Sequence, residues 1–250
     1  MIFLSSTLAF IRSLLVVLLF PLTILILGPL SLILHYLLHN RSLDNFFITL
    51  WGQLCCWMSG VEVIVDGRHN IPQEGCLFLF NHASFFDVFA ITGYLSGVRF
   101  GAKAELFKIP IFGQAMKAVG TLPISRKNRD EVYKIYEEAK LRFANGEQFA
   151  LSSEGGRFYG PELSPFKAGP FVFAMSAGAP IVPVVIIGAY KALPKGTFLF
   201  NKNKLHHQIY LKILEPISTH NLAVEERKNL QKLVYDRMNS VWVHEKGFQN

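Results

Sequence analysis

A histidine and an aspartate five residues apart, His82 and Asp87, form the pair best suited to chemistry in this chain. They follow the apolar run at 75–80, which indicates a buried strand, and catalytic groups often lie just beyond strand ends in open α/β sheets. Histidine titrates close to neutral pH and suits a general base, and an aspartate can orient the imidazole and stabilise its charged form. Five residues turn an ideal helix by about 500°, so the two side chains can meet only if His82 lies in the turn before the helix.

Asp87 also has a structural interpretation. Ser84 and Asp87 have the spacing of a capping box, with the serine as N-cap and the acidic residue at the third helical position. The capping role and the catalytic role are compatible. A lone histidine is more often packed or hydrogen-bonded than catalytic, so a structural role for His82 stays open at this point.

A second candidate is the glycine-rich turn that follows the expected strand at 148–152. Its residues are Ser153, Glu154, Gly155, Gly156 and Arg157. Glycines let backbone N–H groups approach a ligand closely, and an arginine can hold a phosphate through two hydrogen bonds. Lys103 and the basic cluster around Arg126 could supply further positive charge. Taken singly, such turns are more often structural, and basic clusters are usually solvated surface.

The elements that must position these residues alternate along residues 61–250. Valine-rich alternation and short apolar runs predict strands near 61–67, 75–80, 98–103, 121–125, 148–152 and 181–188, with one or two more within 197–214. Helical spacing and capping residues predict helices near 84–95, 111–119, 129–145, 168–177 and 223–243. Strands alternating with helices predict an α/β domain at 61–250, with a mixed, largely parallel sheet flanked by helices.

Residues 1–60 differ from the rest and are predicted to form a membrane anchor of apolar and interfacial helices. The whole sequence is 51% hydrophobic and only 17% charged, which excludes a disordered chain, a coiled coil and a disulfide scaffold. Residues 13–40 contain no Asp, Glu, Lys or Arg, and about 20 apolar helical residues suffice to cross a bilayer. This run is too long for a signal peptide and lacks a small-residue cleavage site soon after it.

Prolines divide the expected anchor. Pro21 and the pair Gly28-Pro29 predict two helical pieces, roughly 3–27 and 30–39, because proline removes a backbone donor and disfavours helix in the residue before it. These pieces could span a membrane, re-enter it or lie in its interface, and a buried helix pair is the alternative. We expect a membrane location with the active site facing the cytoplasm, on the inner membrane if the chain is bacterial.

Positive charge gathers in the α/β part of the chain. Residues 101–250 hold 21 of the 25 Lys and Arg residues but 13 of the 18 Asp and Glu residues. A basic body beside an apolar anchor suits an anionic membrane or a phosphate-bearing substrate. Nucleic acid is the competing partner, but the zinc-finger, basic-zipper and RNA-recognition patterns are missing from the sequence. Three cysteines, two of them adjacent, indicate reduced thiols, and no Cys–His spacing predicts a metal site.

Four blocks in this order resemble the glycerolipid (lysophospholipid) acyltransferase family, and they are closest in pattern to its 1-acylglycerol-3-phosphate acyltransferases. That family has His-x-x-x-x-Asp first, then a glycine leading to an arginine, then Phe-Pro-Glu-Gly-Thr-Arg, then an apolar strand with proline. The matching residues are Asn81, His82 and Asp87; Gly120 through Arg126; Glu154, Gly155 and Arg157; and Pro180 and Pro183. A run that begins at Lys103 also resembles the family, and the resemblance covers about residues 60–190.

The resemblance implies a membrane-bound enzyme that moves a fatty acyl group from an acyl thioester to the free hydroxyl of lysophosphatidate, giving phosphatidate. His82 would be the general base and Asp87 would orient it, with direct attack and no acyl-enzyme. Lys103, Arg126 and Arg157 would bind the acceptor phosphate, Glu154 would position the arginine or the glycerol, and the turn at 155–156 would donate to the oxyanion. No cofactor or metal is expected, and acyl-CoA or acyl-carrier protein would be the co-substrate.

The sequence departs from the family in the third block, where Ser152, Ser153 and Gly156 replace Phe, Pro and Thr. These differences leave the acceptor head group open, so an acyltransferase for another lysophospholipid is an alternative. A non-catalytic membrane protein that holds anionic lipid is an alternative from a different class. A hydrolase is disfavoured because the chain has no Gly-x-Ser-x-Gly elbow.

Overall fold

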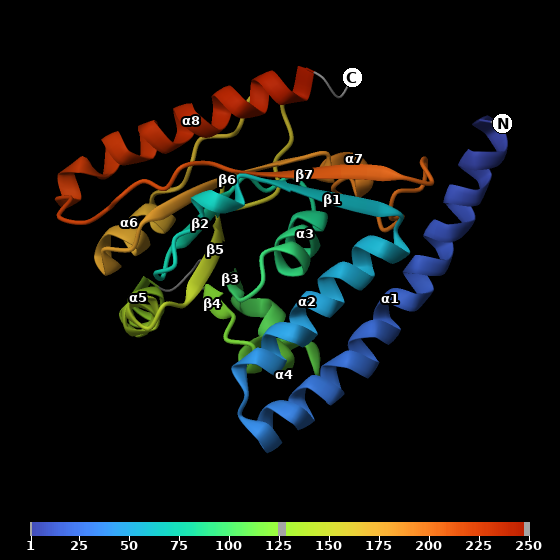
Figure 1. Ribbon diagram of the computed structural model, residues 1–250, viewed down its shortest axis with the longest axis horizontal. Coiled ribbons are helices and arrows are strands. Elements are labelled where there is room, and N and C mark those ends of the chain that lie inside the picture. Colours follow the sequence, from blue (N-terminus) through green and yellow to red (C-terminus); the bar gives the residue numbers. More distant parts are fainter. Residues whose placement is uncertain (1, 125–128, 248–250) are drawn as a thin grey trace.

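The computed structural model describes residues 2–124 and 129–247, and within these ranges a seven-stranded sheet forms the centre of the fold (Figure 1). The strands are β1 (Val61–Asp66), β2 (Leu77–Phe80), β3 (Val98–Lys103), β4 (Leu122–Ile124), β5 (Gln148–Ser152), β6 (Ile181–Ile187) and β7 (His207–Ile213). Their order across the sheet is β1-β7-β6-β2-β5-β3-β4. Strands β6, β2, β5, β3 and β4 are parallel, whereas β7 pairs antiparallel with β6 and parallel with β1. The predicted mixed, largely parallel sheet is confirmed.

Strand β2 lies in the middle of the sheet and is buried on both faces. Phe78 and Phe80 belong to the hydrophobic core on one face, and Leu77 and Leu79 belong to the core on the other. Parallel strands covered on both faces have continuous apolar sequences, because neither row of side chains meets water. This double burial fixes the end of β2, and therefore the start of the loop that carries His82.

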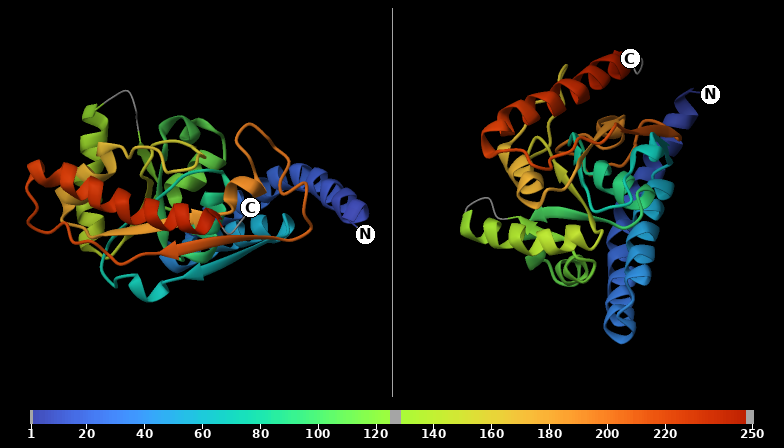
Figure 2. Two further views of the ribbon diagram at one scale, coloured as in Figure 1. Left: turned by 90° about the horizontal axis from the view of Figure 1, so that it is seen from above. Right: turned by 60° about the vertical axis from the view of Figure 1, so that its left-hand side comes forward.

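Helices cover both faces of the sheet (Figures 1 and 2). One face carries α2 (Arg41–Met58), α3 (Phe86–Tyr94) and α7 (Ala189–Ala192), and the other carries α5 (Arg129–Ala144), α6 (Ala168–Ala177) and α8 (Arg227–Gly247). The remaining elements are α1 (Ile2–Leu38), α4 (Phe112–Ala118) and 3₁₀ turns at Arg68–Asn70, Ala104–Lys108 and Val224–Glu226. The result is the three-layer α/β arrangement that the alternation of strands and helices predicts.

Helix α1 lies along the outside of the domain and forms a helical hairpin with α2 (Figure 1). Its buried residues follow helical spacing and are Ala9, Ser13, Val16, Thr23, Gly28 and Ser31. Its outer face is covered by exposed apolar side chains; Leu18 and Leu37 are 69% and 71% exposed. The segment Leu4–Leu38 is long and apolar enough to cross a membrane. Such a face supports membrane association.

The predicted break near residues 28–29 is wrong, because α1 is one continuous helix through Pro21 and Pro29. The hydroxyls of Thr23 and Ser31 each donate to the carbonyl three residues earlier, at 2.7 and 2.8 Å. Neighbouring helices and Ser or Thr hydroxyls that bond to the backbone allow an apolar helix to tolerate proline. The two expected pieces, 3–27 and 30–39, are therefore one element.

Residues 197–214 contain one strand, β7, and residues 197–206 form turns and irregular structure. The carbonyls of Asn201 and Lys204 accept hydrogen bonds from the Arg12 guanidinium, at 2.9 and 2.8 Å, which ties this segment to α1. The expected boundary between residues 60 and 61 coincides with the turn from α2 to β1.

Candidate active site

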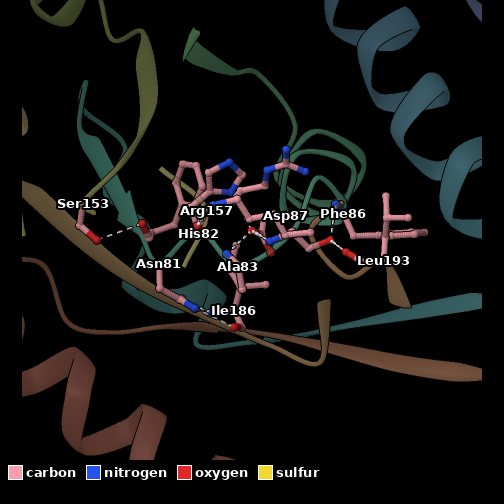
Figure 3. Close-up of polar contacts among 12 residues, drawn as sticks. Asn81, His82, Ala83, Phe86, Asp87, Ser153, Arg157, Ile186 and Leu193 are labelled. Atoms are coloured by element: carbon pink, nitrogen blue, oxygen red, sulfur yellow. Dashed lines mark hydrogen bonds and ion pairs between the residues drawn. The ribbon is translucent and has the colours of Figure 1, made fainter. Parts of the chain in front are cut away.

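His82 and Asp87 are in direct contact at the carboxyl end of β2. The distance from His82 Nδ1 to Asp87 Oδ2 is 2.8 Å (Figure 3). The helix α3 begins at Phe86, so His82 lies in the preceding turn, as the spacing requires. The aspartate side chain is fully buried, whereas the imidazole is 19% exposed. A proton on Nδ1 that is donated to Asp87 leaves the lone pair on Nε2.

Asp87 also organises the start of α3. The same oxygen, Oδ2, accepts hydrogen bonds from the backbone N–H groups of Ala83 and Ser84, both at 2.8 Å. The Ser84 hydroxyl accepts from the N–H of Phe86 at 3.1 Å and donates to the carbonyl of Leu193 at 2.8 Å. The helix begins one residue later than the predicted capping box requires, with Phe85 at the N-cap, but the Ser84 and Asp87 side chains still bond to the backbone here while Asp87 contacts His82. One carboxylate oxygen fixes both the turn and the imidazole.

Asn81 holds the loop that carries His82 against the neighbouring strand β6. Its side-chain amide donates to the carbonyl of Ile186 at 3.0 Å and accepts from the N–H of the same residue at 2.7 Å (Figure 3). Asn81 is 1% exposed, so this side chain takes the place of a strand neighbour beyond the end of β2. Sequence reasoning noted Asn81 only beside His82. A polar residue that directly ends an apolar run was the available signal.

The glycine-rich turn after β5 is fastened to the loop that carries His82. The N–H and the hydroxyl of Ser153 both donate to the carbonyl of Phe80, each at 3.0 Å, and the N–H of Phe158 donates to the carbonyl of His82 at 2.7 Å. Two candidate regions 70 residues apart in the chain thus form one unit. Ser153 is fully buried, and a proline in its place would have neither donor.

Glu154 is buried next to the His–Asp pair and is 5% exposed. Its Oε2 accepts a hydrogen bond from the Ser164 hydroxyl at 3.0 Å. Burial, together with repulsion from Asp87, raises the pKa of Glu154 to about 7, although the bonds from Ser164 and from the His82 N–H act in the opposite direction. Glu154 therefore exchanges a proton near neutral pH within reach of the His–Asp pair. Nothing in the spacing of the sequence identified Ser164 as its partner.

The remainder of the turn is open to the surface. Gly155 has φ +71°, and a Cβ there would lie 2.9 Å from the Lys167 side chain, so this position requires glycine. A Cβ at Gly156 would meet no atom within 4 Å. Arg157 is exposed and is held beside His82, because the next residue, Phe158, bonds to the His82 carbonyl (Figure 3). An exposed cation next to the imidazole can bind an anionic substrate.

Lys103 ends β3 at the same carboxyl edge of the sheet and is exposed. Strand β5 separates β3 from β2, and strands are spaced about 4.8 Å apart, so Lys103 lies two strands, roughly 10 Å, to the side of His82. Arg126 lies outside the described residues. Within the described residues, no three His, Cys, Asp or Glu side chains are grouped so that they could hold a metal ion.

The three cysteines are free and buried. Burial raises the pKa of the Cys56 and Cys76 thiols to about 12, and it raises the pKa of Cys55 still further. Thiolate is the reactive form of cysteine, so these side chains are inert at neutral pH. They offer no nucleophile for an acylated enzyme.

The fold is that of an acyltransferase. Residues 62–187 match the Acyltransferase family, which is half of the chain and includes every described candidate residue. The chain belongs to this family.

The names of similar proteins extend the comparison. The chloroplast 1-acyl-sn-glycerol-3-phosphate acyltransferase of Brassica napus is 27% identical over 64% of this chain and 46% of its own length. The Pseudomonas aeruginosa 1-acyl-sn-glycerol-3-phosphate acyltransferase is 26% identical over 72% of both chains. The crystal structure of the Thermotoga maritima 1-acyl-sn-glycerophosphate acyltransferase superposes with a TM-score of 0.79 at 27% identity, covering 94% of this chain and 96% of that one. The chain spans about half the length of the chloroplast relative.

Proposed function

We propose that this chain transfers a fatty acyl group from an acyl thioester to the free hydroxyl of 1-acylglycerol-3-phosphate, giving phosphatidate. The observation that carries the proposal is the 2.8 Å contact between His82 Nδ1 and Asp87 Oδ2, with the imidazole partly exposed beside Arg157. The activities named for the relatives support lysophosphatidate as the acceptor.

The reaction needs one base and no covalent intermediate. His82 Nε2 removes the proton of the acceptor hydroxyl as the oxygen attacks the thioester carbonyl. The tetrahedral intermediate collapses, the C–S bond breaks, and the leaving thiolate takes the proton back from His82. Asp87 keeps the proton on Nδ1 and stabilises the imidazolium between these two steps. The buried, inert cysteines fit this direct route.

The residues around the base have separate tasks in this scheme. Arg157, with Lys103 and Arg126, binds the acceptor phosphate, since guanidinium and ammonium groups pair strongly with phosphate oxygens. Backbone N–H groups of the turn at 155–156 stabilise the oxyanion. Glu154, which is buried next to the His–Asp pair, orients the glycerol of the acceptor or the Arg157 side chain.

The membrane surface is where the acceptor and the donor would meet. Helix α1 packs along the domain from Arg12, which bonds to residues 201 and 204, to His35, which bonds to Asp44. Its outer apolar face enters lipid while the domain stays at the surface, so the acyl chains of donor and acceptor need not leave the bilayer. We propose that the active site faces the cytoplasm, where acyl-CoA or acyl-carrier protein is the donor.

A matrix of donors and acceptors tests the proposal. The purified chain is assayed with acyl-CoA and acyl-carrier protein against lysophosphatidate and lysophospholipids with larger head groups, with His82→Ala as the blank. Phosphatidate formation that His82→Ala abolishes supports the proposal. Preference for another lysophospholipid would change the proposed acceptor but not the reaction type. This outcome is tested because Ser153 and Gly156 depart from the family pattern in the third block. Thioester cleavage without any acceptor would replace the reaction itself.

A further inference from the structure

Three arginines from three elements converge on Gly120, at the opposite edge of the sheet from His82. Gly120 has φ +80°, and a Cβ there would lie 2.6, 3.3 and 3.5 Å from atoms of Arg142, Arg41 and Arg99. Arg99 is the second residue of β3, and Gly120 precedes β4 by two residues. Four residues along a strand separate Arg99 from Lys103, a distance of about 13 Å. The cluster is therefore separate from the candidate active site.

Gly120 lines a cavity of about 520 Å³ between the tip of the α1–α2 hairpin and the segment from α4 to β4. Basic side chains line it from several directions, and these are His35, His39, Arg41, Lys117 and Arg142. Its carboxylates are Asp44 and Glu138. Both oxygens of Asp44 lie 3.0 Å from His35 Nδ1, so this acid is already paired.

The arginines are only partly neutralised. Arg142 donates to Glu147 Oε2 from Nε and Nη2, at 3.1 and 2.6 Å, and to the Gly120 carbonyl at 2.8 Å. Arg41 is 58% exposed and lies 3.5 Å from the same carboxylate, Glu147. One acid thus serves two guanidinium groups, and a third lies behind them. Positive charge with free donor capacity remains on the cavity wall.

Arg99 lies behind the cavity wall and is not one of the residues that line the cavity. It is 3% exposed; its Nη2 donates to Asn45 Oδ1 at 2.5 Å, whereas its Nε and Nη1 have no hydrogen-bond partner among the described residues. Burial lowers the pKa of this guanidinium, the nearby Glu147 acts in the opposite direction, and the like charge of Arg41 and Arg142 lowers the pKa further. Arg99 therefore adds positive charge behind the cavity wall, and Glu147 compensates only part of the charge of the three arginines. The side chains that an anion in the cavity would meet are those on the wall, among them the exposed Arg41 and Lys117.

The surroundings indicate which anion. The last turn of α1 lies beside the cavity and presents Tyr36, Leu37 and Leu38, which are 67%, 71% and 56% exposed. A ligand with a negative head and an apolar tail meets both surfaces at once. We propose that this cavity binds the phosphate group of an anionic phospholipid and sets the orientation of the α1–α2 hairpin on the membrane. The proposal does not depend on acyl transfer, because His82 takes no part in it.

Vesicle flotation with matched variants tests the site. Arg41→Gln and Lys117→Gln remove exposed charges from the cavity wall, and Arg237→Gln removes an exposed arginine from α8, on the far side of the domain (Figure 1). We expect each cavity variant to bind phosphatidylglycerol-containing vesicles about fivefold more weakly, as for one basic residue near an anionic surface. Binding to pure phosphatidylcholine vesicles, which relies on α1, stays unchanged. Arg237→Gln behaves as wild type, and thermal melts show that all variants are folded.

Two results would overturn the proposal. If Arg41→Gln/Lys117→Gln binds anionic vesicles as tightly as wild type, or if Arg237→Gln weakens binding equally, the attraction is diffuse. The second experiment measures the Tm in inorganic phosphate and in chloride at equal ionic strength. Suppose that phosphate raises the Tm of wild type but not of Arg41→Gln, and that Arg41→Gln binds anionic vesicles as tightly as wild type. The cavity would then bind soluble phosphate, and the lipid proposal would be rejected.

Discussion

Ser153 donates two hydrogen bonds to one acceptor, the carbonyl oxygen of Phe80, from its backbone N–H and from its hydroxyl, each at 3.0 Å. This contact joins the end of β2 to the turn after β5. It therefore joins the residue that precedes the His82 loop to the turn that carries Glu154 and Arg157. The serine stands where the resembled family motif has proline, which has neither donor.

Ser153→Pro is expected to destabilise the protein by roughly 1–3 kcal/mol, because a buried contact loses both donors, and Ser153→Ala by about half as much. Urea unfolding measures both changes. Activity should fall further with proline than stability explains, since the turn is released from the His82 loop. Equal stability of Ser153→Pro and wild type would show that the two bonds contribute nothing.

Asn81→Ala should destabilise the fold by about 2–3 kcal/mol. The substitution leaves the N–H and the carbonyl of Ile186 without the partner that Asn81 provides in a fully buried position. The free energy of unfolding from urea titration measures the loss, and Asn70→Ala, which removes one bond from a less buried loop, serves as the comparison. A loss no greater than that of Asn70→Ala would contradict the bridging role.

Glu154 should make the free energy of unfolding depend on pH. Its pKa is about 7 in the folded protein against 4.5 ordinarily, so the folded state holds a proton that the unfolded chain has released between these values. Its contribution is present below about pH 4.5 and is lost as the pH rises through 7. Glu154→Gln stays uncharged throughout. Between about pH 5 and pH 8 the Tm of wild type should fall relative to that of Glu154→Gln, by the equivalent of at most about 3 kcal/mol. Parallel Tm curves would contradict the assignment.

The variant Asp87→Asn tests whether Asp87 positions His82 or binds the acceptor. The amide keeps the shape of the side chain, but it loses the charge that fixes the Nδ1 proton of His82 and compensates the imidazolium. We expect kcat to fall by about 10²-fold to 10⁴-fold with a much smaller change in KM for lysophosphatidate. Stability should fall by about 1–2 kcal/mol, since Asp87 also caps α3. A change in KM alone would place Asp87 in acceptor binding instead.

Local patterns account for most of what sequence reasoning predicted correctly. The apolar runs at 75–80 and 181–188 are strands because both of their faces are buried, and the spacing of His82 and Asp87 required the turn that the structure contains. Periodicity and capping residues are local, so they located nearly every element without knowledge of its neighbours.

The missed features depend on contacts that are distant in the sequence. Pro21 and Pro29 predicted a broken helix, but α2 and hydroxyls within α1 support a continuous one. Arg12, an isolated charge in an apolar run, bonds to a segment more than 180 residues away. The cluster at Gly120 combines arginines from α2, β3 and α5, which no linear motif records. The role of Arg126 in binding the acceptor phosphate remains a prediction, because this residue lies outside the described residues.

The most direct test of the account is the rate of lysophosphatidate acylation by purified His82→Ala, compared with His69→Ala. His69 is exposed and follows β1, which runs antiparallel to β2, so it lies at the opposite edge of the sheet and controls for the loss of an imidazole. The account predicts that His82→Ala loses at least about 10²-fold in kcat while its Tm and vesicle binding match those of His69→Ala. A folded His82→Ala protein that acylates lysophosphatidate at the rate of His69→Ala would contradict it.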